Sequence, residues 1–308
     1  MSLRAELVRF ALRRCIKHGR RFGRSLPQTR RRLISAERFV PPPPRGFATL
    51  TVDAGGVPAE CVIPPATSRA APGARHVLFL HGGGYAGGSP RLYRNLTWRL
   101  AAAAEAALLC LDYRLAPEHP FPAALDDAFA GYGFLLAEGL DPRRIVLIGD
   151  SAGGGLVFAL MLRLRDEGGP LPGAAIALSP WTDLALTGPS LHENAAADPM
   201  IDPDKVPPLA DYYLAGADPR TPYASPLYGD LAGLPPTLIQ VGSDEVLRDD
   251  SVRMAERLRA AGVNVALEIW PRMPHVWHAF APLVPESRRA IARIGAFLRD
   301  RAAAETAV

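Results

Sequence analysis

The sequence Arg-Ile-Val-Leu-Ile-Gly-Asp-Ser-Ala-Gly-Gly-Gly-Leu-Val-Phe-Ala-Leu, residues 144–160, decides the fold. An apolar run of strand length is followed by Gly149-Asp150-Ser151-Ala152-Gly153 and then by an apolar run of helical length. The pattern Gly-x-Ser-x-Gly between a strand and a helix is typical of a nucleophile elbow. Glycines are needed on both sides because the sharp turn brings other backbone very close. We therefore predict that Ser151 is a nucleophile, supported by the N-terminus of the helix behind it.

Short apolar runs alternate with longer helical stretches on both sides of this segment. Most of the runs are apolar throughout rather than alternating, as expected for strands that helices cover on both faces. This alternation predicts an α/β protein of the α/β-hydrolase type, with a mostly parallel sheet of about eight strands flanked by helices, and a helical cap. The predicted strands are 48–53 and 58–63, which form a hairpin, and 76–80, 107–113, 144–149, 174–178, 237–241 and 265–270. The predicted helices are 92–104, 122–137, 152–165, 248–261 and 285–303.

Two segments do not follow this rhythm. The stretch from Pro180 to Leu234 is rich in Pro, Asp and Tyr and holds no strong strand pattern, so we predict a cap insertion at about 185–222. The four prolines at 41–44 form a stiff linker that cannot be helical. We therefore expect a basic helical cap segment at 1–45, followed by a catalytic domain at 46–308.

Composition limits the kinds of protein that the chain can be. The chain has 308 residues, of which 48% are hydrophobic and 21% charged, enough to form a large core. No apolar run reaches 18 residues, and the basic start lacks the apolar region of a secretory signal, so we expect a cytoplasmic protein. The three cysteines match no metal-binding spacing, and neither a His-Glu-x-x-His motif nor a dinucleotide fingerprint is present. We predict no metal and no cofactor.

Charge is spread unevenly along the chain. Residues 1–45 hold 13 Lys and Arg against 2 Asp and Glu, a net charge of +11, whereas the remainder carries −7. This arm either lies as a cap on its own acidic domain or makes weak contact with an anionic membrane surface. Without aromatic interleaving or a recognisable motif, we expect no nucleic-acid partner. An apolar stripe at helical spacing, which can face a lid, a partner subunit or lipid, comprises Leu3, Leu7, Val8, Ala11, Cys15 and Ile16.

The motif His-Gly-Gly-Gly-Tyr at 81–85 ends an early strand. Acyl transfer needs amide donors aimed at the developing oxyanion, and glycines allow a substrate to approach the backbone closely. We predict that Gly82 and Gly83 supply two donors and Ala152 the third, and that Gly84 serves the shape of the loop. His81 is expected to brace the loop rather than to react. Tyr85 is predicted to contact the substrate.

A serine nucleophile needs a base and an acid that orients the base, in the chain order serine, acid, histidine. Asp244 directly follows the strand at 237–241 and is the predicted acid; Glu245 beside it is expected to border the substrate pocket. Two rivals for the acid, Asp249 and Asp250, fall in the following helix. His275, in a proline-flanked loop after the last strand, is the predicted base, ahead of His278.

Four motifs in this order resemble the hormone-sensitive-lipase-like family of bacterial esterases. They are His-Gly-Gly-Gly-Tyr at 81–85, Asp-Tyr-Arg-Leu-Ala-Pro-Glu at 112–118, Gly-Asp-Ser-Ala-Gly-Gly at 149–154 and Met-Pro-His at 273–275. The resemblance covers residues 48–308. It implies a triad of Ser151, Asp244 and His275, with Gly82, Gly83 and Ala152 as oxyanion donors. It also implies a cap built from N-terminal helices and an insertion before the acid. Substrates with short to medium acyl chains and a homodimer are implied as well. Many members have Asp-Pro-Leu at the acid, where this chain has Asp244-Glu245-Val246.

These residues predict a serine carboxylesterase that hydrolyses small ester substrates through an acyl-enzyme. The same machinery also serves a hydrolase of amides, lactones or carbamates. A non-catalytic receptor on the same fold is the second alternative, because a fold does not by itself determine a function. Such a receptor would usually have lost the serine or the histidine, and both are present.

Overall fold

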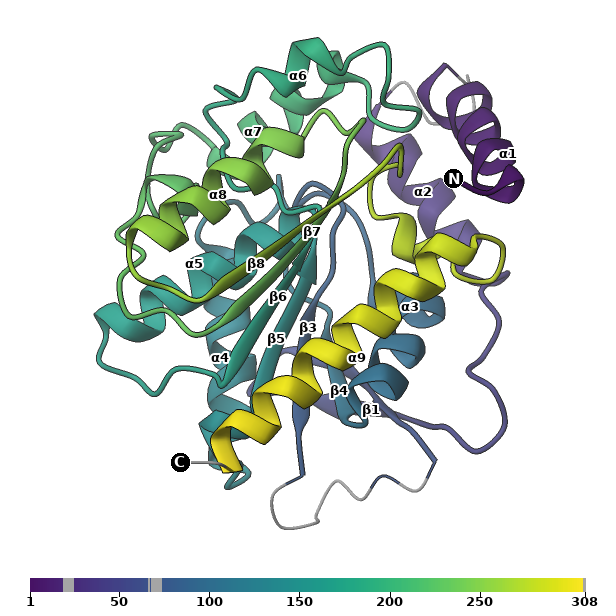
Figure 1. Ribbon diagram of the computed structural model, residues 1–308. Helices are drawn as coiled ribbons and strands as arrows, with labels where there is room; N and C mark the ends of the chain where they lie inside the picture. Colours follow the sequence, from purple (N-terminus) through teal and green to yellow (C-terminus); the bar gives the residue numbers. More distant parts are fainter. Residues whose placement is uncertain (19–24, 66, 68–73, 307–308) are drawn as a thin grey trace.

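The computed structural model describes residues 1–18, 25–65, 67 and 74–306 (Figure 1). Residues 19–24 of the predicted cap segment therefore lie outside the described residues.

The described residues form an eight-stranded sheet in the order β1-β2-β4-β3-β5-β6-β7-β8. The hairpin strands pair antiparallel with each other and β2 pairs antiparallel with β4, whereas all other neighbours are parallel. This confirms the predicted fold class. The strands are β1 (Ala48–Asp53), β2 (Pro58–Ile63), β3 (His76–Leu80), β4 (Ala107–Leu111), β5 (Ile145–Asp150), β6 (Ala174–Leu178), β7 (Thr237–Gly242) and β8 (Val265–Trp270).

Helices cover both faces of the sheet, which explains why its central strands are apolar throughout (Figure 1). Along β3, Leu78 and Leu80 belong to the core cluster shared with helices α4, α5 and α8, whereas Val77 and Phe79 belong to the cluster shared with α3 and α9 on the other face. The helices are α1 (Leu3–Leu12), α2 (Leu26–Glu37), α3 (Pro90–Ala104), α4 (Ala123–Ala137), α5 (Ala152–Asp166), α6 (Ser190–Glu193), α7 (Val206–Leu214), α8 (Arg248–Ala260) and α9 (Pro285–Thr306).

The stretch between β6 and β7, where no strong strand was expected, contains two helices. They are the short α6 and the longer α7, both within the predicted insertion at 185–222. Helix α7 presses Tyr213 against the glycine-rich loop, where its ring stacks on Tyr85 at 3.7 Å between centroids. The carbonyl of Tyr213 also accepts a hydrogen bond from Phe121 N–H. The insertion therefore packs directly over the carboxyl edge of the sheet.

Helix α1 packs on the catalytic domain through a different face from the predicted apolar stripe. Its buried side chains are Ala5, Arg9 and Leu12, whereas Leu3 and Leu7 are exposed. The helix packs through Ala5 against a small cluster that includes Met273 and Trp277. The inner face is partly polar because it meets backbone carbonyls and a carboxylate of the catalytic domain. Most of the predicted stripe is therefore left on the outside.

Candidate active site

Ser151 occupies a tight turn between β5 and α5. Its backbone has φ +53°, a left-handed value that a non-glycine residue adopts only under strain. A Cβ atom on Gly149 would lie 2.2 Å from the carbonyl oxygen of Gly153, and one on Gly153 would lie 2.0 Å from that of Leu80. The turn therefore has the strand-to-helix geometry expected from the motif, and both glycines are required by close backbone contacts.

His275 lies in the loop after β8, buried at the carboxyl edge of the sheet. Its Nδ1 atom lies 2.7 Å from Oε2 of Glu245, a buried carboxylate on the turn after β7. Burial lowers the pKa of His275, but the hydrogen bond and the negative charge of Glu245 outweigh this effect and raise the pKa above its ordinary value. A carboxylate on Nδ1 holds the imidazole so that Nε2 is free to act as a base.

The partner of His275 corrects the sequence-based prediction of the acid. Asp244 does not take this position: its Oδ2 accepts a hydrogen bond from Arg9 at 2.7 Å, and its Oδ1 accepts one from Ser243 Oγ at 2.8 Å. Glu245 was expected to border the substrate, and that prediction is also wrong, because its side chain is fully buried on His275.

The turn after β7 explains why Glu245 points inward. The N–H of Gly242 donates to Oε1 of Glu245 at 2.6 Å, and the hydroxyl of Ser179 donates to the same oxygen at 2.7 Å. These two bonds hold the carboxylate beneath the sheet edge, and the preceding Asp244 is directed away. One signal in the sequence could have identified Glu245. Glu245-Val246-Leu247 matches the leucine of the Asp-Pro-Leu pattern, whereas Asp244-Glu245-Val246 does not.

Ser179 is a residue that the sequence analysis missed. It directly follows β6 and joins the loops on either side. Its hydroxyl donates to Glu245 and accepts a hydrogen bond from Val276 N–H at 3.2 Å. The residue before it, Leu178, accepts a hydrogen bond from the N–H of Ser151 at 2.9 Å. Hydrogen bonds therefore link the ends of β5, β6, β7 and β8, where Ser151, Glu245 and His275 lie.

The glycine-rich loop after β3 requires a second correction. The N–H of Gly82 donates to Oδ1 of Asp150 at 2.9 Å, so the prediction of Gly82 as an oxyanion donor is wrong. Gly83 and Gly84 follow with φ values of +121° and +63°. Within the described part of the chain, the N–H groups of Gly83, Gly84 and Ala152 show no hydrogen-bond acceptor. These three N–H groups therefore differ from that of Gly82, which the fold already uses.

Asp150, inside the elbow motif, connects the elbow to the glycine-rich loop. Besides Gly82 N–H, its carboxylate accepts a hydrogen bond from the hydroxyl of Tyr93 at 2.9 Å. Burial raises the pKa of Asp150 to about 7, although both donors and the charge of His275 act in the opposite direction. The contact fixes the position of Gly82, and through it the direction of the two glycines that follow.

His81 braces this loop, as expected. Its Nδ1 lies 2.8 Å from the carbonyl oxygen of Gly82, and its ring stacks on Tyr113 at 4.3 Å. Burial lowers its pKa to about 4, so it stays neutral at neutral pH. Tyr85 is only 1% exposed, and its ring is stacked on Tyr213. The predicted substrate contact of Tyr85 is therefore not supported; its ring anchors the loop instead.

The rival residues have structural contacts. His278 Nε2 lies 2.8 Å from Oε1 of Gln240, and burial, with the charge of His275, lowers its pKa to about 3. Asp249 accepts a hydrogen bond from Ser190 N–H at 2.8 Å. Asp250 accepts bonds from the N–H groups of Thr182 and Asp183 at 2.7 and 2.9 Å. These contacts hold α6 and the segment before the insertion against α8.

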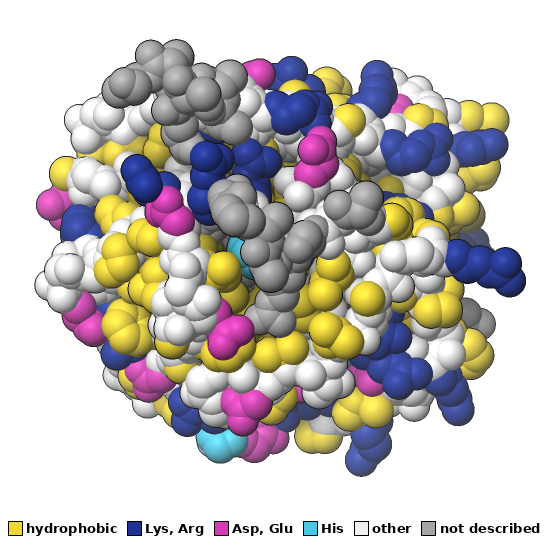
Figure 2. Space-filling view, turned by 90° about the horizontal axis from the view of Figure 1, so that it is seen from below, with side chains coloured by type: hydrophobic (Ala, Val, Ile, Leu, Met, Phe, Trp, Pro, Cys, Tyr) yellow, Lys and Arg dark blue, Asp and Glu magenta, His cyan; other side chains and the backbone are white. Residues whose placement is uncertain are grey.

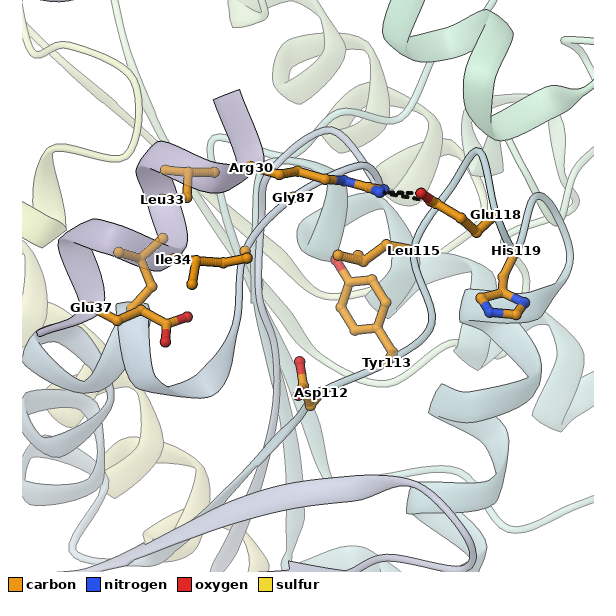
Figure 3. A pocket seen from close by; sticks show the side chains of 12 residues that line it. Arg30, Leu33, Ile34, Glu37, Gly87, Asp112, Tyr113, Leu115, Glu118 and His119 are labelled. Atoms are coloured by element: carbon orange, nitrogen blue, oxygen red, sulfur yellow. Dashed lines mark hydrogen bonds and ion pairs between the residues drawn. The ribbon is translucent and has the colours of Figure 1, made fainter. Parts of the chain in front are cut away.

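A cavity of about 380 Å³ lies next to Gly87 and Gly88, directly after the glycine-rich motif (Figure 3). Helix α2 forms one wall and the segment 112–119 the other. Arg30 spans it, with hydrogen bonds to Glu118 and to the carbonyls of Ala86 and Ala116. None of the candidate catalytic residues lines this cavity. The cavity therefore lies where Arg30 joins α2 to the segments with Ala86 and Ala116.

Among the residues that the structure describes, no group of three or more His, Cys, Asp or Glu side chains could hold a metal ion. Over the same residues, no helix combines the length and apolar character needed to cross a membrane.

The fold and the site are those of a serine hydrolase of the α/β-hydrolase class. The serine lies on a strained strand-to-helix turn, and a buried carboxylate–imidazole pair and free amide donors lie at the same edge of the mostly parallel sheet. A family model described as "alpha/beta hydrolase fold" matches residues 77–279. The chain belongs to this family and, within it, to the hormone-sensitive-lipase-like bacterial esterases, which are carboxylic ester hydrolases. The predictions of family and enzyme class are thereby confirmed.

Curated proteins and a solved structure resemble this chain over most of its length. An acetyl-hydrolase of Streptomyces hygroscopicus is 53% identical over 225 residues, which is 73% of this chain and 75% of that protein. The putative acetyl-hydrolase LipR of Mycobacterium tuberculosis is 38% identical over 97% of this chain and 95% of its own. The crystal structure of an esterase from the bacterial hormone-sensitive lipase family is 45% identical, with a TM-score of 0.89 over 98% of this chain and 99% of that one.

Proposed function

We propose that Ser151, His275 and Glu245 form the catalytic triad of a carboxylesterase. The observation that carries the proposal is the 2.7 Å contact between Glu245 Oε2 and His275 Nδ1, next to the elbow that presents Ser151. Carboxylate, imidazole and serine come from the loops after three strands whose carboxyl ends share one edge of the sheet.

The reaction then proceeds in two halves. His275 Nε2 takes the proton from Ser151 Oγ as this oxygen attacks the ester carbonyl. The N–H groups of Gly83, Gly84 and Ala152 hold the oxyanion. The imidazolium, balanced by Glu245, passes its proton to the departing alcohol and leaves an acyl-serine. Water, deprotonated by His275, attacks the acyl-serine and releases the carboxylic acid.

The substrates we propose are esters of short to medium acyl chains. Two relatives carry the name acetyl-hydrolase, and the family resemblance points to the same range. A series of p-nitrophenyl esters from acetate to palmitate measures the preferred length, and matched anilides distinguish an esterase from an amidase. Labelling of Ser151 by a fluorophosphonate probe tests the nucleophile. A Ser151→Ala variant should lose turnover by about 10⁶-fold; a variant as active as the wild type would disprove the triad.

We also propose weak contact between the outer face of α1 and an anionic membrane surface. Leu3, Leu7 and Phe10 lie on one stripe of this helix and are 77%, 61% and 64% exposed. Arg4 and Arg14 are exposed beside them. By contrast, the end of the molecule viewed in Figure 2 shows basic and acidic side chains interspersed. An apolar stripe with arginines at its borders suits the interface of an anionic bilayer.

Sedimentation with phosphatidylglycerol vesicles tests this contact. We expect a Leu7→Glu, Phe10→Glu variant to remain in the supernatant while the wild type sediments, with phosphatidylcholine vesicles as the control. Equal sedimentation of both proteins would disprove the contact. The homodimer and the cytoplasmic location expected from the sequence stay predictions; analytical ultracentrifugation and cell fractionation test them.

A further inference from the structure

Arg9 of helix α1 is the polar centre of the contact between this helix and the catalytic domain. Although it is an arginine near the N-terminus, it is only 7% exposed. Its guanidinium donates to Oδ2 of Asp244 at 2.7 Å, to the carbonyl of Arg272 at 2.6 Å and to the carbonyl of Ala197 at 3.3 Å. One side chain thus joins three segments that are far apart in the sequence.

Two of these segments carry the proposed acid and base. Asp244 precedes Glu245, and Arg272 lies three residues before His275. Ser243 connects the same two segments, because its hydroxyl donates to Asp244 and accepts the N–H of Arg272 at 2.8 Å. The turn with Glu245 and the loop with His275 are therefore both tied to Arg9.

The third segment supports the same region from the insertion. The buried carboxylate of Asp198, next to Ala197, accepts the N–H of Val246 at 3.0 Å. Lys17, one turn beyond the end of α1, donates to the carbonyls of Ala195 and Asp198. The first helix therefore contacts the turn that holds Glu245 both directly and through the insertion.

We propose that Arg9 and Asp244 are a positioning pair: their contact holds the turn with Glu245 and the loop with His275 at the separation that catalysis needs. The pair touches no reacting atom and acts only through Glu245 and His275, so the inference rests on the proposed function. The charge-assisted, largely buried contact suits such a role because it is directional and costly to leave unpaired. The N-terminal helix is then part of the catalytic geometry.

The test compares Arg9→Gln, Asp244→Asn and the double variant with the wild type. For each single variant we expect kcat for p-nitrophenyl acetate to fall about tenfold, with KM changed less than about twofold, because a misplacement of about 1 Å at a reacting group can cost about 100-fold. The double variant should be no worse than the poorer single variant, because both changes remove the same contact. Arg9→Lys, which keeps one charged donor, should retain an intermediate kcat.

A second measurement separates positioning from mere support of the fold. The Nδ1 proton of His275, hydrogen-bonded to Glu245, should give a downfield proton NMR resonance in the wild type. We expect this resonance to shift or broaden in Asp244→Asn at a temperature where circular dichroism shows the variant to be fully folded. The matched control is Arg143→Gln, which removes an exposed ion pair with Asp141, at 2.8 Å, before the start of β5, and should leave both kcat and the resonance unchanged.

Unchanged kcat in Asp244→Asn would overturn the proposal, as would a loss that only parallels a loss of folded protein. Should Arg9→Gln fail to fold, Asp244→Asn still decides, since its side chain lies at the edge of the site with 18% exposure. Failure of the proposed function looks different: Ser151→Ala and Glu245→Gln would then be as active as the wild type.

Discussion

Glu245 Oε2 lies 2.7 Å from His275 Nδ1, while the adjacent Asp244 bonds to Arg9 at the same distance on the other side of the turn. Two neighbouring carboxylates thus have different roles, one toward the base and one toward the N-terminal helix. We expect a Glu245→Gln substitution to lower kcat by about 10⁴-fold, because an amide cannot hold the imidazole in the required tautomer. Steady-state kinetics with p-nitrophenyl acetate measures the loss.

Glu245→Asp is the control for this prediction. It keeps the charge on a shorter side chain and should recover part of the activity. The assignment of the acid would be wrong if Glu245→Gln kept its activity and Asp244→Asn lost about 10⁴-fold instead.

The pH dependence of kcat/KM reports on the same pair. His275 must be neutral to accept the serine proton, so activity should rise with pH through the pKa of His275, which lies above its ordinary value of 6.5. In Glu245→Gln the imidazolium loses its negative partner, so its pKa falls and the acidic limb should move to lower pH. A limb that stays in place would show that Glu245 does not control the base.

The same raised pKa links His275 to stability. The folded state binds the proton more tightly than the unfolded state, so the stabilisation is complete below the unfolded pKa and is lost as the pH rises through the folded pKa. Urea unfolding of the wild type and Glu245→Gln at pH 5 and pH 8 should show this: the difference between them is expected to be larger at pH 5.

Tyr93→Phe tests the connection between the elbow and the glycine-rich loop. It removes the hydroxyl that donates to Asp150 and leaves a buried carboxylate with one fewer donor, which should cost about 1–3 kcal/mol in free energy of unfolding. The pKa of Asp150 is about 7 in the fold, so the carboxylate is ionised above that pH and needs the donor most there. The loss should therefore be greater at pH 8 than at pH 6 in urea unfolding. An equal loss at both pH values would contradict this.

Gly153→Ala tests the close approach at the elbow. The added Cβ would lie 2.0 Å from the carbonyl oxygen of Leu80, which is backbone and cannot move aside, so we expect a loss of about 3 kcal/mol or more and a sharp fall in activity. Thermal unfolding followed by circular dichroism measures it. Gly133→Ala in α4 is the control, because nothing lies within 4 Å of its added Cβ, and it should be neutral or slightly stabilising.

The sequence by itself determined the α/β-hydrolase class, the place of Ser151 between a strand and a helix, and the place of His275 in the loop after the last strand. These depend on local patterns: an apolar strand, a glycine-flanked turn, and a proline-bounded loop after the last strand. The strand ends were also predicted closely; β4 ends at Leu111, two residues before the expected end.

Only the tertiary structure decided which of two adjacent acids meets the base and which glycine N–H groups remain free. Asp244 and Glu245 both follow the same strand directly, but bonds from Gly242 and Ser179, the latter on another strand's loop, turn Glu245 inward. Gly82 resembles its neighbours until Asp150, 68 residues away, occupies its N–H. The orientation of α1 likewise depends on the hydrogen bond between Arg9 and Asp244. Each outcome is set by a hydrogen-bond partner distant in the chain, and local pattern carries no information about such partners.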